Sequence, residues 1–274
     1  MRPLADLSDA VLADVVAVFT DIDDTLTSEG QLPAASYAAL EQLAGAGLAI
    51  VPITGRPAGW CDMIARFWPV AGIVGENGAF YFSYDRTARK MRQRFFASDA
   101  ERRENRRKLD ALREKILAEV PGTGIASDQL YREADLAIDV CEDVDPLPAA
   151  EVDRVLALFK AAGAVAKLSS IHVNGWFGDY DKLSMSRVFA ADILGIDLDR
   201  KKQRIVFVGD SPNDGPMFSF FPNSCGVANV VDFKDSGSAL PAFVAPSRGG
   251  EGFVEIAERI LGARAVPQRE RAHG

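Results

Sequence analysis

Residues 18–27 read VFTDIDDTLT, an apolar run that ends in three aspartates within four positions. The run belongs to a β-branched stretch over residues 15–20, which predicts a short buried strand. Carboxylates this close repel one another, and they are costly at the end of a buried strand unless an opposite charge compensates. The stretch therefore predicts a strand that ends at a site for a positive group.

Apolar runs and helical patterns alternate at both ends of the chain. Helices are predicted at residues 33–46, from Pro57 onward, at 181–194 and at 251–261 with a stop at Gly262, and strands at residues 15–20, 48–53, 204–208 and 224–228. Strands that are apolar on both faces and separated by helices indicate a parallel sheet covered on both sides. We therefore expect an α/β fold with a doubly wound, Rossmann-like parallel sheet.

The middle of the chain breaks this alternation. It begins with a basic segment and Gly/Pro breaks, and then predicts a strand over residues 136–140, a helix over 147–162 and a strand over 171–177. We expect a core formed by residues 1–82 and 178–262, an inserted α+β domain at 83–177, and a flexible tail at 263–274.

The basic segment, residues 86–115, holds twelve Arg and Lys residues. Glu101, Glu104, Asp110 and Glu114 lie among them at spacings of three and four, which is typical of a salt-bridged, solvated helical face. A surface that binds a polyanion is the alternative, and the sequence leaves both open.

Composition limits the class of protein. The 274 residues are 48% hydrophobic and 26% charged, as in a soluble globular protein, and the net charge of −8 argues against nucleic acid or an anionic membrane as the main partner. Cys61, Cys141 and Cys225 are scattered, which fits a reducing compartment. Without a secretory signal or a run of 18 apolar residues, we expect a cytoplasmic protein, and nothing points to an obligate protein partner.

Four polar segments directly follow apolar runs or open a helix. They are DIDDT at residues 21–25, TGRP at 54–57, DKL at 181–183 and GDSPND at 209–214. Each alone is ordinary capping or turn chemistry. In an open parallel sheet, however, ligands bind outside the carboxyl ends of the strands, so we expect these segments to meet in one crevice.

The crevice would gather four carboxylates, those of Asp21, Asp23, Asp210 and Asp214. Such a cluster needs a cation, and an all-oxygen site without thiols suits Mg²⁺. Gly55, Lys182 and the hydroxyl of Thr54 would supply donors and positive charge for an anion beside the metal. These are the parts of a phosphoryl-transfer site.

D-x-D-x-T after a strand, T-G-R-P, a helix-opening Lys and G-D-x-x-N-D resemble the four motifs of the haloacid dehalogenase (HAD) superfamily, over residues 1–82 and 178–274. The resemblance implies that Asp21 attacks phosphorus to form an aspartyl-phosphate, and that Asp23 protonates the leaving group and then activates water. It also implies two sets of ligands. Phosphate would be bound by Thr54, Gly55, Lys182 and Asn213, and Mg²⁺ by Asp21, the Asp23 carbonyl, Asp210 and Asp214, the last directly or through water.

Asp24 departs from the pattern, because many relatives have glycine at that position. Asp tolerates unusual φ angles better than most residues. We interpret Asp24 as a turn residue and not as a further catalytic acid.

The position of the insertion indicates a cap type. About 30 residues separate Asp23 from Thr54, whereas 128 positions separate Thr54 from Lys182. An insertion at this point resembles the C2 caps of the Cof-type, sucrose-phosphate and trehalose-phosphate phosphatases. GENGA at residues 75–79 is similar to the E-N-G-A stretch of the C2B subgroup, although a loop with a helix-stop glycine is the alternative.

The last strand of the cap supplies candidate substrate contacts. Because residues 171–176 alternate between apolar and polar, His172, Asn174 and Trp176 share one face. The strand leads into Asp181 and Lys182, so its end should lie near the crevice. We expect His172 and Asn174 to contact the leaving group, followed by Arg56 and Asn77 at the rim of the core; an ordinary half-exposed strand is the alternative.

The sequence thus predicts a Mg²⁺-dependent phosphatase that acts on a small phosphorylated metabolite, with a sugar phosphate as the expected class. One alternative is a phosphomutase that resembles the phosphomannomutases. A non-enzymatic phospho-aspartate switch is disfavoured because response-regulator receivers are about half this length and have no cap insertion. A halide-releasing dehalogenase is disfavoured because Asp23 supplies the acid that ester cleavage needs.

Overall fold

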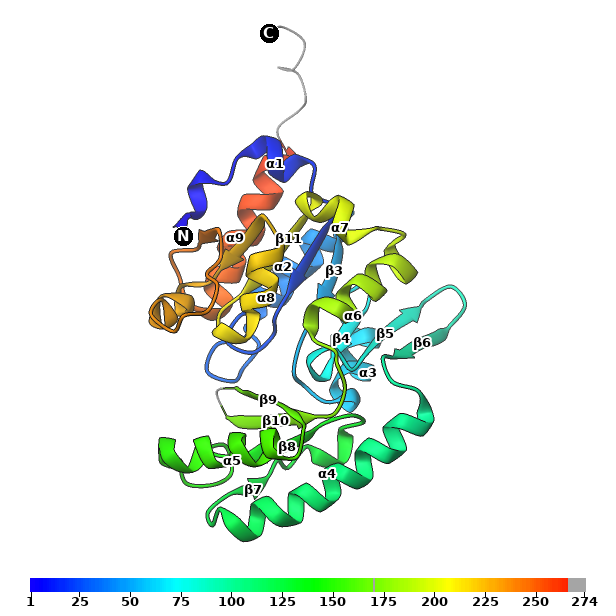
Figure 1. The fold of residues 1–274 in the computed structure, drawn as a ribbon. Helices are drawn as coiled ribbons and strands as arrows, with labels where there is room; N and C mark the ends of the chain where they lie inside the picture. The colour runs from blue at the N-terminus through cyan, green and yellow to red at the C-terminus, as the bar shows by residue number, and fades with distance from the viewer. Residues whose placement is uncertain (170, 266–274) are drawn as a thin grey trace, which may run out of the picture.

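The computed structural model describes residues 1–169 and 171–265 of the chain. Two layered parts lie one above the other in Figure 1, a larger part with a central sheet and a smaller part below it. The larger part contains both ends of the described chain, and the smaller part comes from the middle of the sequence.

The central sheet has six strands, all paired in parallel, in the order β1-β13-β12-β11-β2-β3. The strands span Arg2–Pro3 (β1), Ala17–Thr20 (β2), Ala49–Pro52 (β3), Ile205–Gly209 (β11), Asn223–Gly226 (β12) and Phe243–Val244 (β13). The parallel sheet predicted from the alternation of elements is confirmed. The short strands β1, at the edge of the sheet, and β13, beside it, are additions that the sequence did not predict.

Helices cover both faces of this sheet because its strands are apolar on both sides. Val206 and Val208 belong to one apolar cluster and Phe207 to another on the opposite face. The first face is covered by α1 (Asp9–Ala13), α2 (Ala34–Gly45) and α9 (Gly249–Ala265), and the second by α6 (Lys182–Phe189), α7 (Leu198–Lys201) and α8 (Gly215–Phe220).

The C-terminal helix is longer than the sequence predicted. The predicted stop at Gly262 is wrong, because α9 continues to Ala265. Ala263 is buried, and the Arg264 guanidinium donates to the carbonyl of Val15 at 2.8 Å, so tertiary contacts outweigh the weak helix propensity of one glycine. Residues 266–274, the rest of the predicted tail, lie outside the described residues.

The smaller part is the cap. Its four-stranded antiparallel sheet has the order β7-β8-β10-β9, with bounds Gly124–Ile125 (β7), Leu136–Asp139 (β8), Val165–Leu168 (β9) and His172–Trp176 (β10). Helices α4 (Asp99–Glu119) and α5 (Ala149–Ala161) pack on the apolar face of this sheet. The opposite face is turned toward the core (Figure 1).

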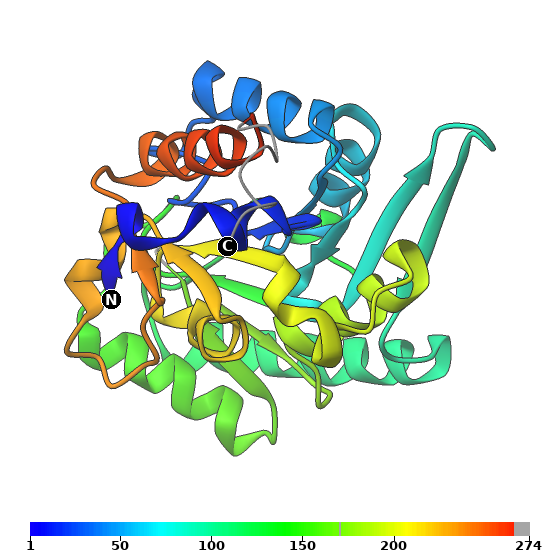
Figure 2. The same ribbon diagram turned by 90° about the horizontal axis from the view of Figure 1, so that it is seen from above.

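A hairpin that the sequence pattern did not predict connects the core to the cap. After α3 (Ala58–Phe67), strands β4 (Ile73–Gly75), β5 (Phe80–Asp85) and β6 (Lys90–Phe95) form a three-stranded antiparallel sheet. The tip of the β5–β6 hairpin stands away from the rest of the molecule in Figure 2. Position 83, where we expected the inserted domain to begin, lies inside β5.

Most of the basic segment lies in β6 and α4, where several of its Arg and Lys side chains form ion pairs. In α4, Arg102 pairs with Asp99, and Lys115 with Glu119. In β6, Arg92 pairs with Asp85 of the neighbouring strand. These contacts support the salt-bridged interpretation over a polyanion-binding surface.

Within the described residues, every helix is either too short or too polar to cross a bilayer.

Candidate active site

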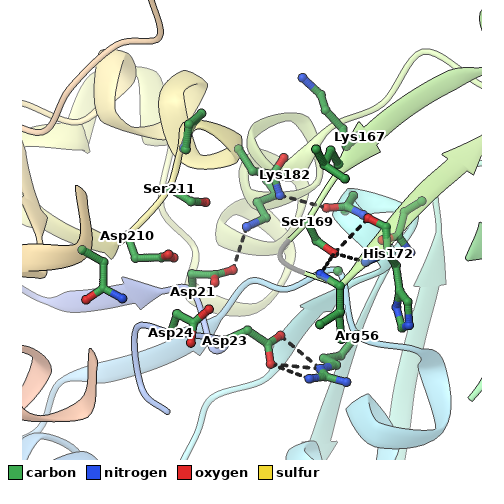
Figure 3. A pocket seen from close by; sticks show the side chains of 18 of the residues that line it. Asp21, Asp23, Asp24, Arg56, Lys167, Ser169, His172, Lys182, Asp210 and Ser211 are labelled. Carbon is green, nitrogen blue, oxygen red and sulfur yellow. Dashed lines mark hydrogen bonds and ion pairs between the residues drawn. The ribbon is translucent and has the colours of Figure 1, made fainter. Parts of the chain in front are cut away.

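Neighbouring strands of the core bring the polar segments to one edge of the sheet. Asp21 follows β2, Asp210 follows β11, and Thr54 lies two residues beyond the end of β3. Because β11, β2 and β3 are adjacent and parallel, their carboxyl ends meet. Lys182 is the first residue of α6, whose N-cap is Asp181, and it points into the same place (Figure 3).

Three carboxylates and one ammonium form the centre of the site. One carboxylate oxygen each from Asp21, Asp210 and Asp214 lies within 4.8 Å of the others. Lys182 Nζ donates to Asp21 at 2.7 Å and to Asp214 at 2.9 Å. The hydroxyl of Thr25, the last residue of the DIDDT segment, donates to Asp210 at 3.1 Å, so all three carboxylates have a protein donor or cation.

With every group ionised, negative charge would exceed positive charge in this cluster, and the pKa values of Asp21 and Asp210 are raised. Burial, and after it the neighbouring carboxylates, raises the pKa of Asp210 to about 9. Burial also raises the pKa of Asp21 to about 7, partly offset by Lys182. Burial lowers the pKa of Lys182, but Asp21 and Asp214 more than reverse this and raise it. Since one ammonium faces three crowded, thiol-free carboxylates, the donor set fits a hard divalent cation such as Mg²⁺.

The backbone is shaped to hold Asp214 beside Asp210. The backbone N–H of Asp210 donates to Asp214 at 3.1 Å. A Cβ atom on Gly209 would lie 2.4 Å from the same carboxylate oxygen, so only glycine leaves room for it. This explains the glycine of the GDSPND segment by close approach.

The loop after β3 is held by its own hydrogen bonds and by Asn77. The Thr54 hydroxyl accepts the backbone N–H of Arg56 at 3.0 Å, and the Thr54 carbonyl accepts that of Asn77 at 3.0 Å. The Asn77 side-chain oxygen accepts a bond from Asn213 at 3.4 Å, and Gly55 lies against the same amide. Asn77 therefore connects this loop to the loop after β11, although Thr54 itself is buried below the cavity surface.

Arg56 and Asp23 form an ion pair at the rim. The guanidinium donates to both carboxylate oxygens of Asp23, at 2.8 to 3.1 Å, and stacks over the Trp60 ring at 4.5 Å. Arg56 therefore lines the cavity as the sequence predicted, with its Nε and Nη2 bonded to Asp23, and its contact with substrate stays a prediction. Asp24 has φ 57°, which agrees with its interpretation as a turn residue.

A cavity of about 460 Å³ lies between core and cap. Its core wall includes Asp21, Asp23, Lys182 and Asp210, and its cap wall includes Arg132, Lys167, Ser169, His172 and Asn174. Phe233 and Leu168, 39% and 49% exposed, line it from opposite sides. The volume suits a small metabolite.

The two predicted cap residues line the cavity but already have partners. Asn174 donates to Asp135 at 3.0 Å. His172 Nε2 lies 2.9 Å from a carboxylate oxygen of Glu142 without the alignment of a hydrogen bond, and burial lowers the His172 pKa. Their shared polar face is thus turned toward the cavity as expected, with part of its hydrogen-bonding capacity used inside the cap.

Two further residues of the cap wall, Arg132 and Lys167, were not predicted from the sequence. Lys167 lies directly opposite Asn174 in the cap sheet, so the two share a face, and it makes no ion pair among the described residues. Lys167 could not be predicted from the sequence, because residues 165–168 have a weak strand pattern. Only the pairing register of β9 with β10 places Lys167 on the face that lines the cavity. Arg132 lies outside the strands, in a segment without a periodic pattern.

Comparisons with known proteins rest on structure, because no family model and no curated protein matches the sequence. A protein of Thermoplasma acidophilum superposes with a TM-score of 0.69 at 19% identity, over 90% of this chain and 98% of that one. A HAD/COF-like hydrolase from Plasmodium vivax gives 0.66 at 19% identity, over 93% and 99%. The sucrose-phosphatase of Synechocystis, in complex with sucrose and phosphate, gives 0.62 at 14% identity, over 90% and 98%.

These neighbours define the class of fold. A parallel, doubly wound core with an inserted antiparallel cap is shared across nearly the whole length of each chain. The chain has the fold of the haloacid dehalogenase-like hydrolases of type IIB, which confirms the predicted fold class and resemblance.

Proposed function

We propose that this protein is a Mg²⁺-dependent phosphatase that hydrolyses a small phosphorylated metabolite through an aspartyl-phosphate. The observation that carries the proposal is the Asp21 carboxylate, which faces the cavity between Lys182 and the Asp210 carboxylate. A carboxylate nucleophile, a fixed cation and a metal-ligating carboxylate are the groups that phosphoryl transfer needs.

In the proposed reaction, a carboxylate oxygen of Asp21 attacks phosphorus while the bond to the leaving oxygen breaks. Lys182, which already bonds to Asp21 at 2.7 Å, neutralises charge on the phosphoryl oxygens. Water then attacks the aspartyl-phosphate, releasing inorganic phosphate and restoring Asp21. A bound Mg²⁺, held by Asp21, Asp210, the Asp23 carbonyl and, directly or through water, Asp214, would supply charge neutralisation and orientation of the phosphoryl group.

Asp23 is the proposed acid and base. It would give a proton to the leaving oxygen and later take one from the attacking water. The Arg56 guanidinium donates to both carboxylate oxygens, although each oxygen has a second lone pair, so we expect this contact to loosen when Asp23 turns toward the leaving oxygen. Substrate binding at the rim would be the event that separates the pair.

A phosphate-release screen tests the proposal. The full chain with Mg²⁺ is incubated with a panel of sugar phosphates, other phosphorylated metabolites and p-nitrophenyl phosphate. We expect release of inorganic phosphate with sugar phosphates among the best substrates, which is the class suited to a polar cap wall and to a sucrose-phosphatase-like fold. Transfer of phosphate between positions of one sugar, dependent on a bisphosphate activator, would instead identify a phosphomutase.

Lys167 provides a specific test of substrate recognition. Replacing Lys167 by Met removes an unpaired cation from the cap wall and should lower kcat/KM for the best sugar phosphate by about 10- to 100-fold, the loss of one or two hydrogen bonds that involve a charged group. Activity on p-nitrophenyl phosphate should change by less than about threefold, because its leaving group offers no hydroxyl.

Lys160→Met is the matched control, since Lys160 is exposed on α5, on the outer side of the cap sheet. Lys167 is a cleaner probe than His172 or Asn174, because removal of Asn174 also disturbs Asp135. Equal losses on both substrates with Lys167→Met would exclude a role in substrate recognition.

A further inference from the structure

Glu76 joins the cap to the core through four backbone hydrogen bonds. Its carboxylate is fully buried. Oε1 accepts the N–H groups of Ala58 (3.0 Å) and Glu133 (2.9 Å), and Oε2 accepts those of Ala134 (2.6 Å) and Asp135 (3.2 Å). Ala58 begins α3 in the core, whereas residues 133–135 lead into β8 of the cap, so one side chain connects both parts.

The backbone at this point is held in an unusual conformation. Glu76 and Asn77 have φ angles of 42° and 56°, which non-glycine residues rarely adopt. Gly78 follows with φ 107°, and a Cβ atom there would lie 2.0 Å from the carbonyl oxygen of Asp181, next to Lys182. Such a turn persists only where its surroundings fix it, and it aims the Glu76 side chain at the cap.

Arg132 makes the reciprocal contact from the cap. Its side chain is 2% exposed, and Nη1 donates to the carbonyl of Gly55 at 3.1 Å and to Asp135 at 3.0 Å. Nε and Nη2 bind the Asp128 carboxylate at 2.8 and 3.1 Å. A cap guanidinium therefore touches the backbone of the loop that carries Thr54 and Arg56.

These bonds are separate from the two chain crossings between core and cap. The crossings run through residues 96–98 and 177–181, where Phe96 and Tyr180 are in ring contact at 5.5 Å. Glu76 and Arg132 thus form a third attachment. With three attachments, the cap cannot swing away as a rigid body without breaking the bonds to Glu76.

We propose that Glu76 and Arg132 are positioning residues that latch the cap onto the core and fix the Gly55 loop in the conformation that binds the phosphoryl group. The inference rests on the proposed phosphatase function. It also assigns the route of entry: substrate reaches the cavity between Leu168 of β9 and Phe233 of the core, which line the cavity from cap and core and are partly exposed.

The test is Glu76→Gln, which keeps the shape of the side chain. In either orientation of the amide, two of the four N–H donors then face an NH₂ group. We expect kcat/KM on the best panel substrate to fall by about 10- to 100-fold, as for a small misplacement of binding groups. The inhibition constant of inorganic phosphate should rise about fivefold or more, the effect of one weakened hydrogen bond.

Hydrogen exchange gives a readout that does not need catalysis. The amides of residues 133–135 should exchange about tenfold faster or more in Glu76→Gln than in the wild type, while amides of β2 and β11 stay protected. The control is Glu101→Gln, because Glu101 also accepts a backbone N–H, that of Ser98 at the N-cap of α4, but is exposed and contacts neither Ala58 nor residues 133–135. That variant should match the wild type in kcat/KM and in exchange of residues 133–135.

Arg132→Lys is the second variant, and it covers the case in which Glu76→Gln does not fold. Lysine keeps the charge but has only three N–H donors on one nitrogen, so it cannot keep the two bonds to Asp128 together with those to Gly55 and Asp135. We expect the same fall in kcat/KM and the same rise in the phosphate inhibition constant. A folded variant with wild-type values of kcat/KM and of the phosphate inhibition constant would contradict the proposed latch. A variant whose only change is a lower melting temperature would contradict it as well. If the wild type releases no phosphate from any panel member, the proposed function is wrong. Hydrogen exchange of residues 133–135 would still show whether Glu76 holds the cap on the core.

Discussion

Replacing Asp21 by Asn is expected to lower kcat by about 10⁴-fold or more on the best phosphorylated substrate. Asparagine keeps the size of the side chain but cannot attack phosphorus as an anion, so the covalent route is lost. The fold should survive, because the substitution removes one of three crowded carboxylates and leaves Lys182 its bond to Asp214. Phosphate release in the steady state and in a single turnover measures the effect.

The matched control is Asp24→Asn. Asp24 also lines the cavity, and Asn tolerates its left-handed φ of 57° about as well as Asp does. We expect its kcat to stay within about tenfold of the wild type, since we assign it no chemical role. If Asp21→Asn kept more than about a tenth of wild-type activity while folded, the nucleophile would have to be another group.

Removing divalent metal should abolish activity, and Mg²⁺ should restore it. Ca²⁺ should substitute poorly, because its longer bonds and higher coordination number displace the attacking carboxylate. The physical basis is the buried group of Asp21, Asp210 and Asp214, in which one lysine does not balance three carboxylates. Full activity in exhaustively chelated protein would remove the metal from the mechanism.

Stability provides a second readout for the metal. A ligand that binds only the folded state stabilises it by about 2.7 kcal/mol at a concentration of 100 Kd, so Mg²⁺ should raise the melting temperature of the wild type by several degrees. Asp210→Asn should lose most of this shift. Asp232→Asn is the control, because Asp232 lines the same cavity but is paired with Arg248. Equal Mg²⁺ shifts in all three proteins would contradict the assigned ligands.

The structure also changes how the cap face is interpreted. The sequence pointed to His172 and Asn174 as substrate contacts, and both line the cavity. Their partners, Glu142 and Asp135, make them part of a cap-internal polar network as well. Lys167, without an ion pair among the described residues, is therefore the sharper candidate for recognising the leaving group.

The core of the fold and the acidic cluster could be predicted from the sequence. Asp21, Thr54 and Asp210 each stand just beyond a short apolar run, and a parallel sheet brings such positions to one edge whatever the details of packing. The local signals there are strong: β-branched runs give the strands, and Gly, Pro and Asp mark the turns that follow them.

Tertiary structure alone decided how these groups are paired. Arg56 meets Asp23 across 33 positions, and Lys182 meets Asp21 across 161, with bond lengths that no spacing rule supplies. The same holds for Glu76, whose partners lie 57 to 59 positions away in the cap. The GENGA stretch marked the position of Glu76 but not its partners, because these are backbone N–H groups, which almost every residue type offers.

The pairing register of the cap strands is a further feature that could not be predicted from the sequence. Lys167 faces the cavity because β9 pairs with β10 so that it lies opposite Asn174, and a slip of one residue would turn it to the other face. The extension of α9 past Gly262 likewise depends on Arg264 reaching the carbonyl of Val15. The sequence by itself determined the sheet, its polar edge and the acidic cluster, because these follow from local pattern and strand direction. The cap wall of the cavity and the contact that holds it over the core were decided only in three dimensions, by contacts between segments far apart in the chain.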